Sequence, residues 1–192
     1  MSERWFLLKQ FLRHPLQVGA IAPSGKALCK ELVGWLELDK AAAAAELGPG
    51  TGVVTREAVE QCGKTTRFFA VELDKTIYEE FKLILPEVEI FNANACELDK
   101  LCQIEGIKEL DAVVSGLPWA SFPSGLQQEI LSAVVRSLKP EGKFSTFAYL
   151  QGLVLPGGVH FRKLLEKEFS QVTLSKVVWK NLPPAIVYRC IK

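Results

Sequence analysis

The sequence predicts an α/β fold in which helices cover both faces of a mostly parallel sheet. From residue 41 onward, short apolar runs alternate with amphipathic stretches, which is typical of βαβ units. The 192 residues are 48% hydrophobic and 23% charged, as expected for one packed domain. The last two apolar runs are joined too closely for a parallel crossover, so we expect the final strand to be antiparallel.

The elements follow in order from the same pattern. Seven apolar runs predict strands at 41–47, 67–73, 88–91, 111–115, 142–149, 172–179 and 185–191. Amphipathic stretches predict helices at 53–61, 75–85, 125–138 and 160–169. Pro86 and Pro140 end the second and third of these helices, because proline cannot continue a helix. The loop 181–184 joins the last two strands.

Residues 1–36 are expected to form an N-terminal helical segment, which covers the ligand site that the motifs below indicate, ahead of a domain at 37–192. Residues 2–14 predict a short helix with apolar residues on one side and Lys9 and Arg13 on a flank. This pattern suits a helix that lies on a membrane surface, and equally one that packs on its own domain. A glycine-containing loop at 18–25 precedes a second helix, which Ser24 could cap unless its hydroxyl faces a ligand.

Charge is distributed unevenly along the chain although the net charge is only +1. Residues 1–30 carry a net charge of +4, residues 31–138 of −9 and residues 139–192 of +6. Basic ends indicate an anionic partner, such as a phospholipid surface or a nucleic acid, or simply a solvated surface.

Five cysteines and two histidines show no metal-binding spacing, so we expect no metal site and reduced thiols. No apolar run approaches the roughly 18–20 residues of a membrane span, and the N-terminus shows neither the long apolar core nor the small-residue cleavage site typical of a signal peptide. We therefore expect a cytoplasmic protein that can lie on the inner face of the cytoplasmic membrane.

A glycine-rich turn follows the first strand and opens a helix. Its residues are Glu46-Leu-Gly48-Pro-Gly50-Thr-Gly52. Glycine permits a sharp turn and lets a ligand approach the backbone N–H groups. The spacing matches neither a dinucleotide-binding loop nor a phosphate-binding P-loop.

An acid at the end of the second strand extends this motif. Glu72 lies 22 residues after Gly50, where a carboxylate can accept hydrogen bonds from ribose hydroxyls. A solvent-exposed strand end is the alternative for Glu72.

Together these residues resemble the cofactor motif of the class I S-adenosylmethionine (SAM)-dependent methyltransferases. The resemblance implies a Rossmann-like seven-stranded sheet, with the glycine loop at the methionine part of SAM and Glu72-Leu73 at the ribose. It places Asn94-Ala95 beside the adenine, where the family often has Asp-Ala. The residues that this resemblance assigns to the cofactor are Ser24, Glu46, Gly48, Gly50, Gly52, Glu72, Leu73, Asn94, Ala95 and Ser115.

The end of the fourth strand reads Ser115-Gly-Leu117-Pro118-Trp119. It is similar to the Asn-Leu-Pro-Tyr loops of amino-group methyltransferases, in which oxygens of the loop hold the target nitrogen and a ring lines the pocket. The resemblance makes Ser115, Leu117, Pro118 and Trp119 the catalytic candidates. Trp119 would bound the acceptor pocket, or it could pack as an ordinary loop residue.

Three stretches narrow the resemblance to the bacterial phospholipid N-methyltransferases: 18–24, 115–118 and 179–185. It implies methylation of phosphatidylethanolamine toward phosphatidylcholine at an anionic membrane surface, with S-adenosylhomocysteine as the second product. The alternatives are methylation of adenine N6 in RNA, as in the more distantly similar ribosomal RNA adenine dimethyltransferases, and a non-catalytic SAM-binding module.

Overall fold

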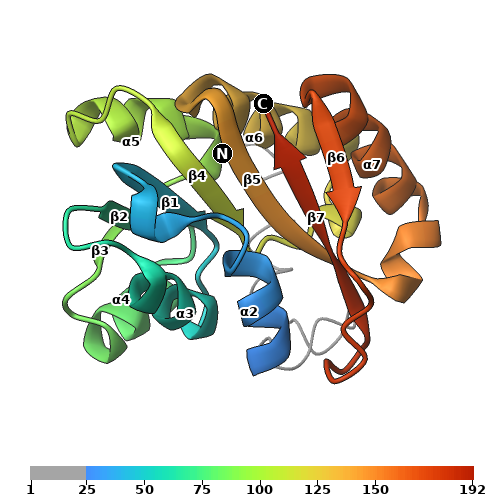
Figure 1. Ribbon diagram of the computed structural model, residues 1–192, viewed down its shortest axis with the longest axis horizontal. Coiled ribbons are helices and arrows are strands. Elements are labelled where there is room, and N and C mark those ends of the chain that lie inside the picture. The colour runs from blue at the N-terminus through green and yellow to red at the C-terminus, as the bar shows by residue number, and fades with distance from the viewer. Residues whose placement is uncertain (1–24) are drawn as a thin grey trace.

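Seven strands form one sheet in the computed structural model, which describes residues 25–192 (Figure 1). Their order is β3-β2-β1-β4-β5-β7-β6. The first five strands pair in parallel, whereas β7 is antiparallel to both β5 and β6. Their bounds are β1 Ala43–Leu47, β2 Arg67–Glu72, β3 Glu89–Asn92, β4 Leu110–Ser115, β5 Leu138–Tyr149, β6 Gln171–Leu174 and β7 Ala185–Ile191. The predicted fold class and the antiparallel final strand are confirmed.

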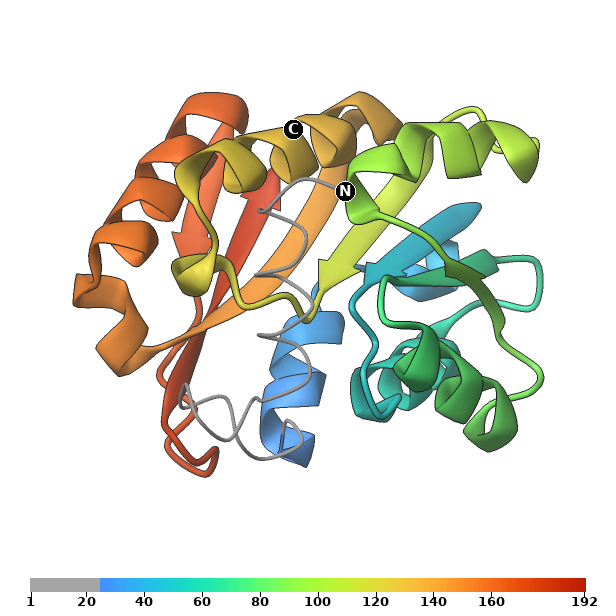
Figure 2. The same cartoon turned by 180° about the vertical axis from the view of Figure 1, so that it is seen from behind.

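Helices cover both faces of this sheet (Figures 1 and 2). One face carries α2 Lys26–Val33, α3 Val53–Gln61 and α4 Lys75–Ile84, and the other carries α5 Leu98–Ile104, α6 Ser124–Ser137 and α7 Pro156–Glu168. Short apolar runs form the strands because both of their faces are buried: all five residues of β1 are buried. None of the helices within residues 25–192 has the length and apolarity needed to cross a bilayer.

The structure differs from the prediction by more than two residues at four elements. Helix α5 was not predicted, helix α7 begins at Pro156 instead of residue 160, and β5 begins at Leu138 instead of residue 142. Strand β6 ends at Leu174, five residues before its predicted end. Beyond it, the Ser175 hydroxyl accepts a hydrogen bond from the Val187 backbone N–H at 2.9 Å. A side-chain oxygen therefore replaces a backbone carbonyl as the acceptor for this residue of β7.

Helix α2 belongs to the core of the domain. Leu28 and Leu32 are fully buried in the cluster that contains Ala44 of β1 and Val54 of α3. Its N-cap is Gly25, whose backbone N–H donates to Asn181 Oδ1 at 2.9 Å. The predicted helix at 2–14, the loop at 18–24 and Ser24 lie outside the described residues, so their roles stay predictions.

The chain changes direction within the sheet between β1 and β4. From β1 it passes outward to β2 and β3, and then it crosses back to β4 on the other side of β1. Leu47 pairs with both Val71 and Ser115, so β1, β2 and β4 end at one edge of the sheet. In open α/β sheets, ligands bind at the carboxyl ends of the strands where the order reverses.

Candidate active site

The three glycines after β1 have left-handed backbones but differ in their surroundings. Their φ angles are 70° at Gly48, 54° at Gly50 and 75° at Gly52. A Cβ on Gly48 would lie 2.7 Å from Leu117 Cδ2, and one on Gly52 would lie 2.7 Å from a Leu85 side-chain atom. A Cβ on Gly50 would meet no atom within 4 Å. The outer glycines therefore permit close packing, whereas the middle one leaves open space where a ligand can approach the backbone.

Glu72 ends β2 beside this loop and is buried, at 2% exposure. It is therefore not the solvent-exposed strand end of the alternative interpretation. Burial raises the pKa of the Glu72 carboxyl, and the backbone N–H groups of Asp74, Leu73 and Gly50 act in the opposite direction. The Asp74 N–H donates to Glu72 Oε1 at 2.9 Å. The backbone thus holds the carboxylate in one orientation next to Gly50.

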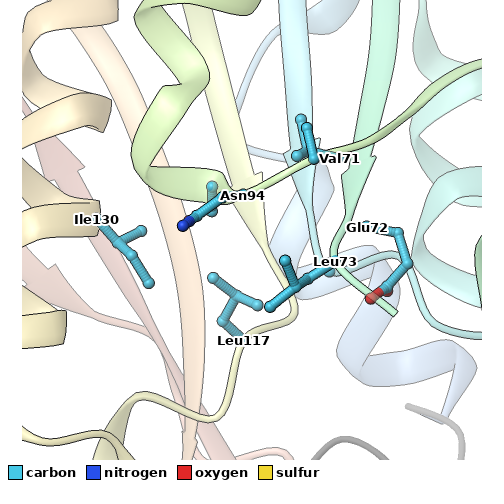
Figure 3. Close-up of a pocket in the computed structure, with 9 residues that line it drawn as sticks. Val71, Glu72, Leu73, Asn94, Leu117 and Ile130 are labelled. Carbon is cyan, nitrogen blue, oxygen red and sulfur yellow. The ribbon is translucent and has the colours of Figure 1, made fainter. Parts of the chain in front are cut away.

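A pocket of about 310 Å³, which includes solvent at its mouth, lies at the carboxyl edge of β1, β2 and β4 (Figure 3). Its wall consists of Gly48, Val71, Glu72, Leu73, Ala93, Asn94, Ala95, Leu117 and Ile130. The structure therefore brings five of the predicted cofactor residues and the catalytic candidate Leu117 together in one wall.

Asn94 offers the pocket a donor. Its Oδ1 accepts a hydrogen bond from the Cys96 backbone N–H at 2.8 Å, which caps a short 3-10 helix. This bond orients the amide so that the nitrogen lies on the pocket side of the side chain (Figure 3). Asn94 is therefore set to donate to a ligand, whereas the aspartate that the family often has at this position only accepts when ionised.

Ser115 occupies the end of β4 but is fully buried. Its Oγ accepts hydrogen bonds from the Leu117 backbone N–H at 3.2 Å and from the Trp119 Nε1–H at 3.1 Å. The Thr146 hydroxyl donates to its carbonyl oxygen at 3.0 Å. The Ser115 hydroxyl, one of the loop oxygens expected to hold the target nitrogen, thus has both acceptor positions occupied by its own loop.

Trp119 lies in the core, with 2% of its surface exposed. Its ring stacks on Phe161 at 4.4 Å between centroids and meets Phe144 edge-on at 6.1 Å. This placement corresponds to the alternative prediction, in which Trp119 packs as an ordinary loop residue instead of bounding the acceptor pocket. Pro118 precedes it as the N-cap of a short 3-10 helix at Trp119–Ser121.

Glu46 lies in β1, two residues before Gly48, and is fully buried. Among the described residues, neither of its carboxylate oxygens has a hydrogen-bond partner. Burial raises the pKa of this carboxyl to about 7; the Thr55 hydroxyl lowers the pKa and the charge of Glu72 raises it. Glu46 does not line the pocket described above, so its expected contact with the cofactor stays a prediction.

Sequence reasoning missed three residues of the wall. Val71 and Ala93 adjoin predicted residues, so their neighbours in sequence could have indicated them. Ile130 comes from α6, and no local pattern separates it from the other core residues of that helix. Among residues 25–192, no group of three or more His, Cys, Asp or Glu side chains is placed to hold a metal ion.

These residues fit SAM. Its ribose diol matches the buried Glu72 carboxylate, and its adenine matches the Asn94 amide. The open space at Gly50 allows the ligand to reach the backbone.

Comparison with known proteins agrees with this assignment, although no family model matches the chain. The chain is 27% identical to ornithine lipid N-methyltransferase from Singulisphaera acidiphila, and the alignment covers 99% of this chain and 96% of that protein. It has the fold of the O-methyltransferase TomG from Streptomyces achromogenes, solved with SAM, with a TM-score of 0.69 at 16% identity over 100% and 91% of the two chains.

Two further structures share the fold. For the O-methyltransferase from Bacillus cereus in complex with SAH, the TM-score is 0.67 at 17% identity over 95% and 91% of the two chains. For TrmN from Thermus thermophilus, the TM-score is 0.65 at 14% identity. The alignment with TrmN covers 96% of this chain, which spans about half (53%) of TrmN.

The fold is that of the class I SAM-dependent methyltransferases, and the chain is similar in sequence to one methyltransferase over nearly its full length. The chain is an enzyme with SAM as its cofactor.

Proposed function

We propose that this enzyme methylates the amine of a membrane lipid headgroup. The observation that carries the proposal is the near full-length likeness to an ornithine lipid N-methyltransferase. Ornithine and ethanolamine headgroups both present a primary amine, so one acceptor site suits either. We place the ornithine headgroup first because of that relative, and phosphatidylethanolamine, the substrate that the sequence implied, second.

Methylation of adenine in RNA fits the acceptor loop less well. A planar exocyclic amine needs two well-placed acceptors, and Ser115 supplies only one side-chain oxygen. That oxygen already accepts two hydrogen bonds from within the loop. Likeness to TrmN does not change this conclusion, because at 14% identity it concerns the fold alone.

The cofactor is held from three sides in this proposal. Glu72 accepts hydrogen bonds from the ribose hydroxyls, and Asn94 Nδ2 donates to a ring nitrogen of the adenine. The backbone at Gly50 admits the methionine part because no Cβ intervenes. Bound SAM supplies an electrophilic methyl group on a positively charged sulfur, which is a good leaving group.

The acceptor amine is held by the backbone of the loop after β4. No described residue donates a hydrogen bond to the Gly116 carbonyl, so we place the amine at this oxygen instead of at Ser115. Ser115 acts by positioning, since its Oγ fixes Leu117 and Trp119. Leu117 and Pro118 present apolar surface to the amine, which favours its neutral form and frees its lone pair for in-line attack.

A direct assay tests this proposal. The full chain is incubated with methyl-labelled SAM and, in parallel, with ornithine lipid, phosphatidylethanolamine and ribosomal RNA, the lipids being dispersed in detergent micelles. We expect label in the amine lipids and none in the RNA. Label in the RNA alone, or in none of the three, would overturn the proposal.

A further inference from the structure

Half of the large apolar side chains exposed in the described chain gather in two segments. Of ten such residues, two lie between β5 and α7, one lies near the start of α7, and two lie between β6 and β7. Val154 is 80% exposed, Trp179 72% and Leu182 79%. We call the five the apolar rim: Val154, Leu155, Val159, Trp179 and Leu182.

Both segments belong to the edge of the sheet that carries the cofactor pocket. Strand β5 runs parallel to β4 and so ends at the same edge. Its last residue, Tyr149, pairs with Ala185, the first residue of β7. The Leu150 backbone N–H then donates to the Pro184 carbonyl at 3.0 Å, so the start of the first segment lies beside the end of the second (Figure 1).

The charge beside the apolar rim has one sign. Residues 175–184, which join β6 to β7, contain two Lys and no Asp or Glu. Lys176 and Lys180 are exposed on either side of Trp179. Exposed apolar and aromatic side chains between lysines are typical of surfaces that insert into the headgroup region of an anionic bilayer. A lipid surface is therefore the partner whose chemistry matches this surface.

We infer that the apolar rim, with Lys176 and Lys180, docks the enzyme onto an anionic lipid surface. This inference rests on the proposed lipid substrate. Docking at this edge places the mouth of the pocket at headgroup level, so the amine reaches the site while the acyl chains stay in the bilayer. Trp179 inserts at the interface, where an indole combines an apolar body with a polar N–H.

A double variant of the full chain tests the docking surface. We expect Trp179→Ser with Leu182→Ser to lower the partition coefficient onto phosphatidylglycerol-containing vesicles by about tenfold or more in a flotation assay. Leu83→Ser with Ile104→Ser is the matched control. It also removes two exposed apolar side chains, but these lie on the helix ends that lead back to the amino ends of β3 and β4. The control is expected to bind vesicles like the wild type.

A charge variant supplies independent evidence. We expect Lys176→Gln with Lys180→Gln to weaken binding to anionic vesicles and to make the remaining binding less dependent on salt. Binding to pure phosphatidylcholine vesicles should be unchanged. An unchanged affinity for SAM, measured by calorimetry, shows that each variant retains the fold.

The outcomes separate this inference from the proposed function. If wild-type enzyme methylates amine lipids in micelles but the rim variant binds vesicles normally, the docking surface is wrong and the proposed function stands. If no amine lipid is methylated, the proposed function fails, and loss of vesicle binding in the rim variant alone still supports a lipid-binding surface. Self-association that the rim variant abolishes, with normal vesicle binding, would assign the rim to a second copy of the chain and overturn the inference.

Discussion

The backbone of Gly116 lies directly against that of Gly48. A Cβ on Gly116 would be 2.6 Å from the Gly48 carbonyl oxygen, and the Gly116 N–H donates to the Leu47 carbonyl at 2.9 Å. The loop proposed to hold the acceptor and the loop that borders the cofactor thus touch at their first residues. Their spacing, on which in-line methyl transfer depends, is set by two residues without side chains.

We expect Gly116→Ala to separate these two loops. The new methyl group meets backbone, which has little freedom to move, so the free energy of unfolding should fall by about 1–3 kcal/mol. Methyl transfer should fall at least about tenfold, because small misplacements of reacting groups are costly. Gly152→Ala is the control, since its Cβ would lie 3.6 Å from Ala120 Cβ, an ordinary contact. Equal activity of the two variants would show that the close approach is unimportant.

Gly50→Arg should abolish SAM binding and leave the chain folded. Arginine fills the open space beside Gly50 and adds a positive charge where a cationic ligand is expected. Because Gly50 has a φ of 54°, any side chain there also costs about 1–2 kcal/mol of strain. Gly106→Arg, at a φ of 64° with equally open surroundings, carries the same strain away from the pocket. Calorimetry should show normal SAM affinity for Gly106→Arg only; normal affinity in both variants would refute the cofactor site.

Glu72→Gln should weaken SAM binding by about 10- to 100-fold, because hydrogen bonds from ribose to an ionised carboxylate are stronger than those to an amide. Stability should not fall, since burial already raises the pKa of Glu72 and the amide removes a charge from the interior. Glu89→Gln, on the exposed side of β3, is the control. The dissociation constant for SAM is the measurement, and an unchanged value for Glu72→Gln would exclude the ribose contact.

Glu46 should make the stability of the ligand-free chain depend on pH. Its pKa is raised to about 7 by burial, so the folded chain binds more protons than the unfolded chain between the usual carboxyl range and pH 7. The free energy of unfolding therefore falls as pH rises through this window. Relative to wild type, Glu46→Gln should gain up to about 3 kcal/mol between pH 5 and pH 8. Urea unfolding of both proteins at several pH values measures this difference. A difference in the free energy of unfolding that stays constant with pH would contradict the raised pKa of Glu46.

Gln127 is expected to position the acceptor loop. It is fully buried in α6, and its Nε2 donates to the carbonyl oxygens of Trp119 at 2.7 Å and Gly157 at 3.0 Å. Gln127→Met leaves both carbonyls without this donor, at a cost of about 1–3 kcal/mol. We expect a raised KM for the lipid and a lower kcat, with SAM affinity unchanged. Gln128→Met, at the next position of α6, is the control. An equal loss of activity in both variants would show that the effect comes from the stability of α6 and not from the acceptor loop.

The elements with strong local signals could be predicted from sequence. Helix α3 was predicted with its observed bounds, since the glycine loop marks its start and its apolar spacing continues to Gln61. Helix α5 was missed because it is only seven residues long, so it shows little periodicity. The early start of β5 depends on tertiary pairing: Leu138 pairs with Leu110, and the register then shifts before Lys143. No local pattern reports such a shift.

The cofactor side of the site was more predictable than the acceptor side. Glycines in the turn after the first strand and an acid at the end of the second strand indicate their roles by residue type and spacing. Gly48 and Glu72 do line the pocket. The use of Ser115 could not be foreseen, because its partner Trp119 Nε1 reaches it only when the indole turns inward to stack on Phe161. That orientation results from packing between β4, β5 and α7, which lie far apart in sequence.

A single amide in the loop between β6 and β7 also limits how the loop can vary in length. Asn181 Oδ1 anchors Gly25 at the start of α2, while its Nδ2 donates to the Pro183 carbonyl at 2.7 Å. Val178 and Ala185 form a bridge that closes the loop around it. Adding or removing a residue between 178 and 185 would therefore displace the first turn of α2, which lies more than 150 positions earlier in the sequence. Insertions should be tolerated far better near Gly106, where the turn faces open space.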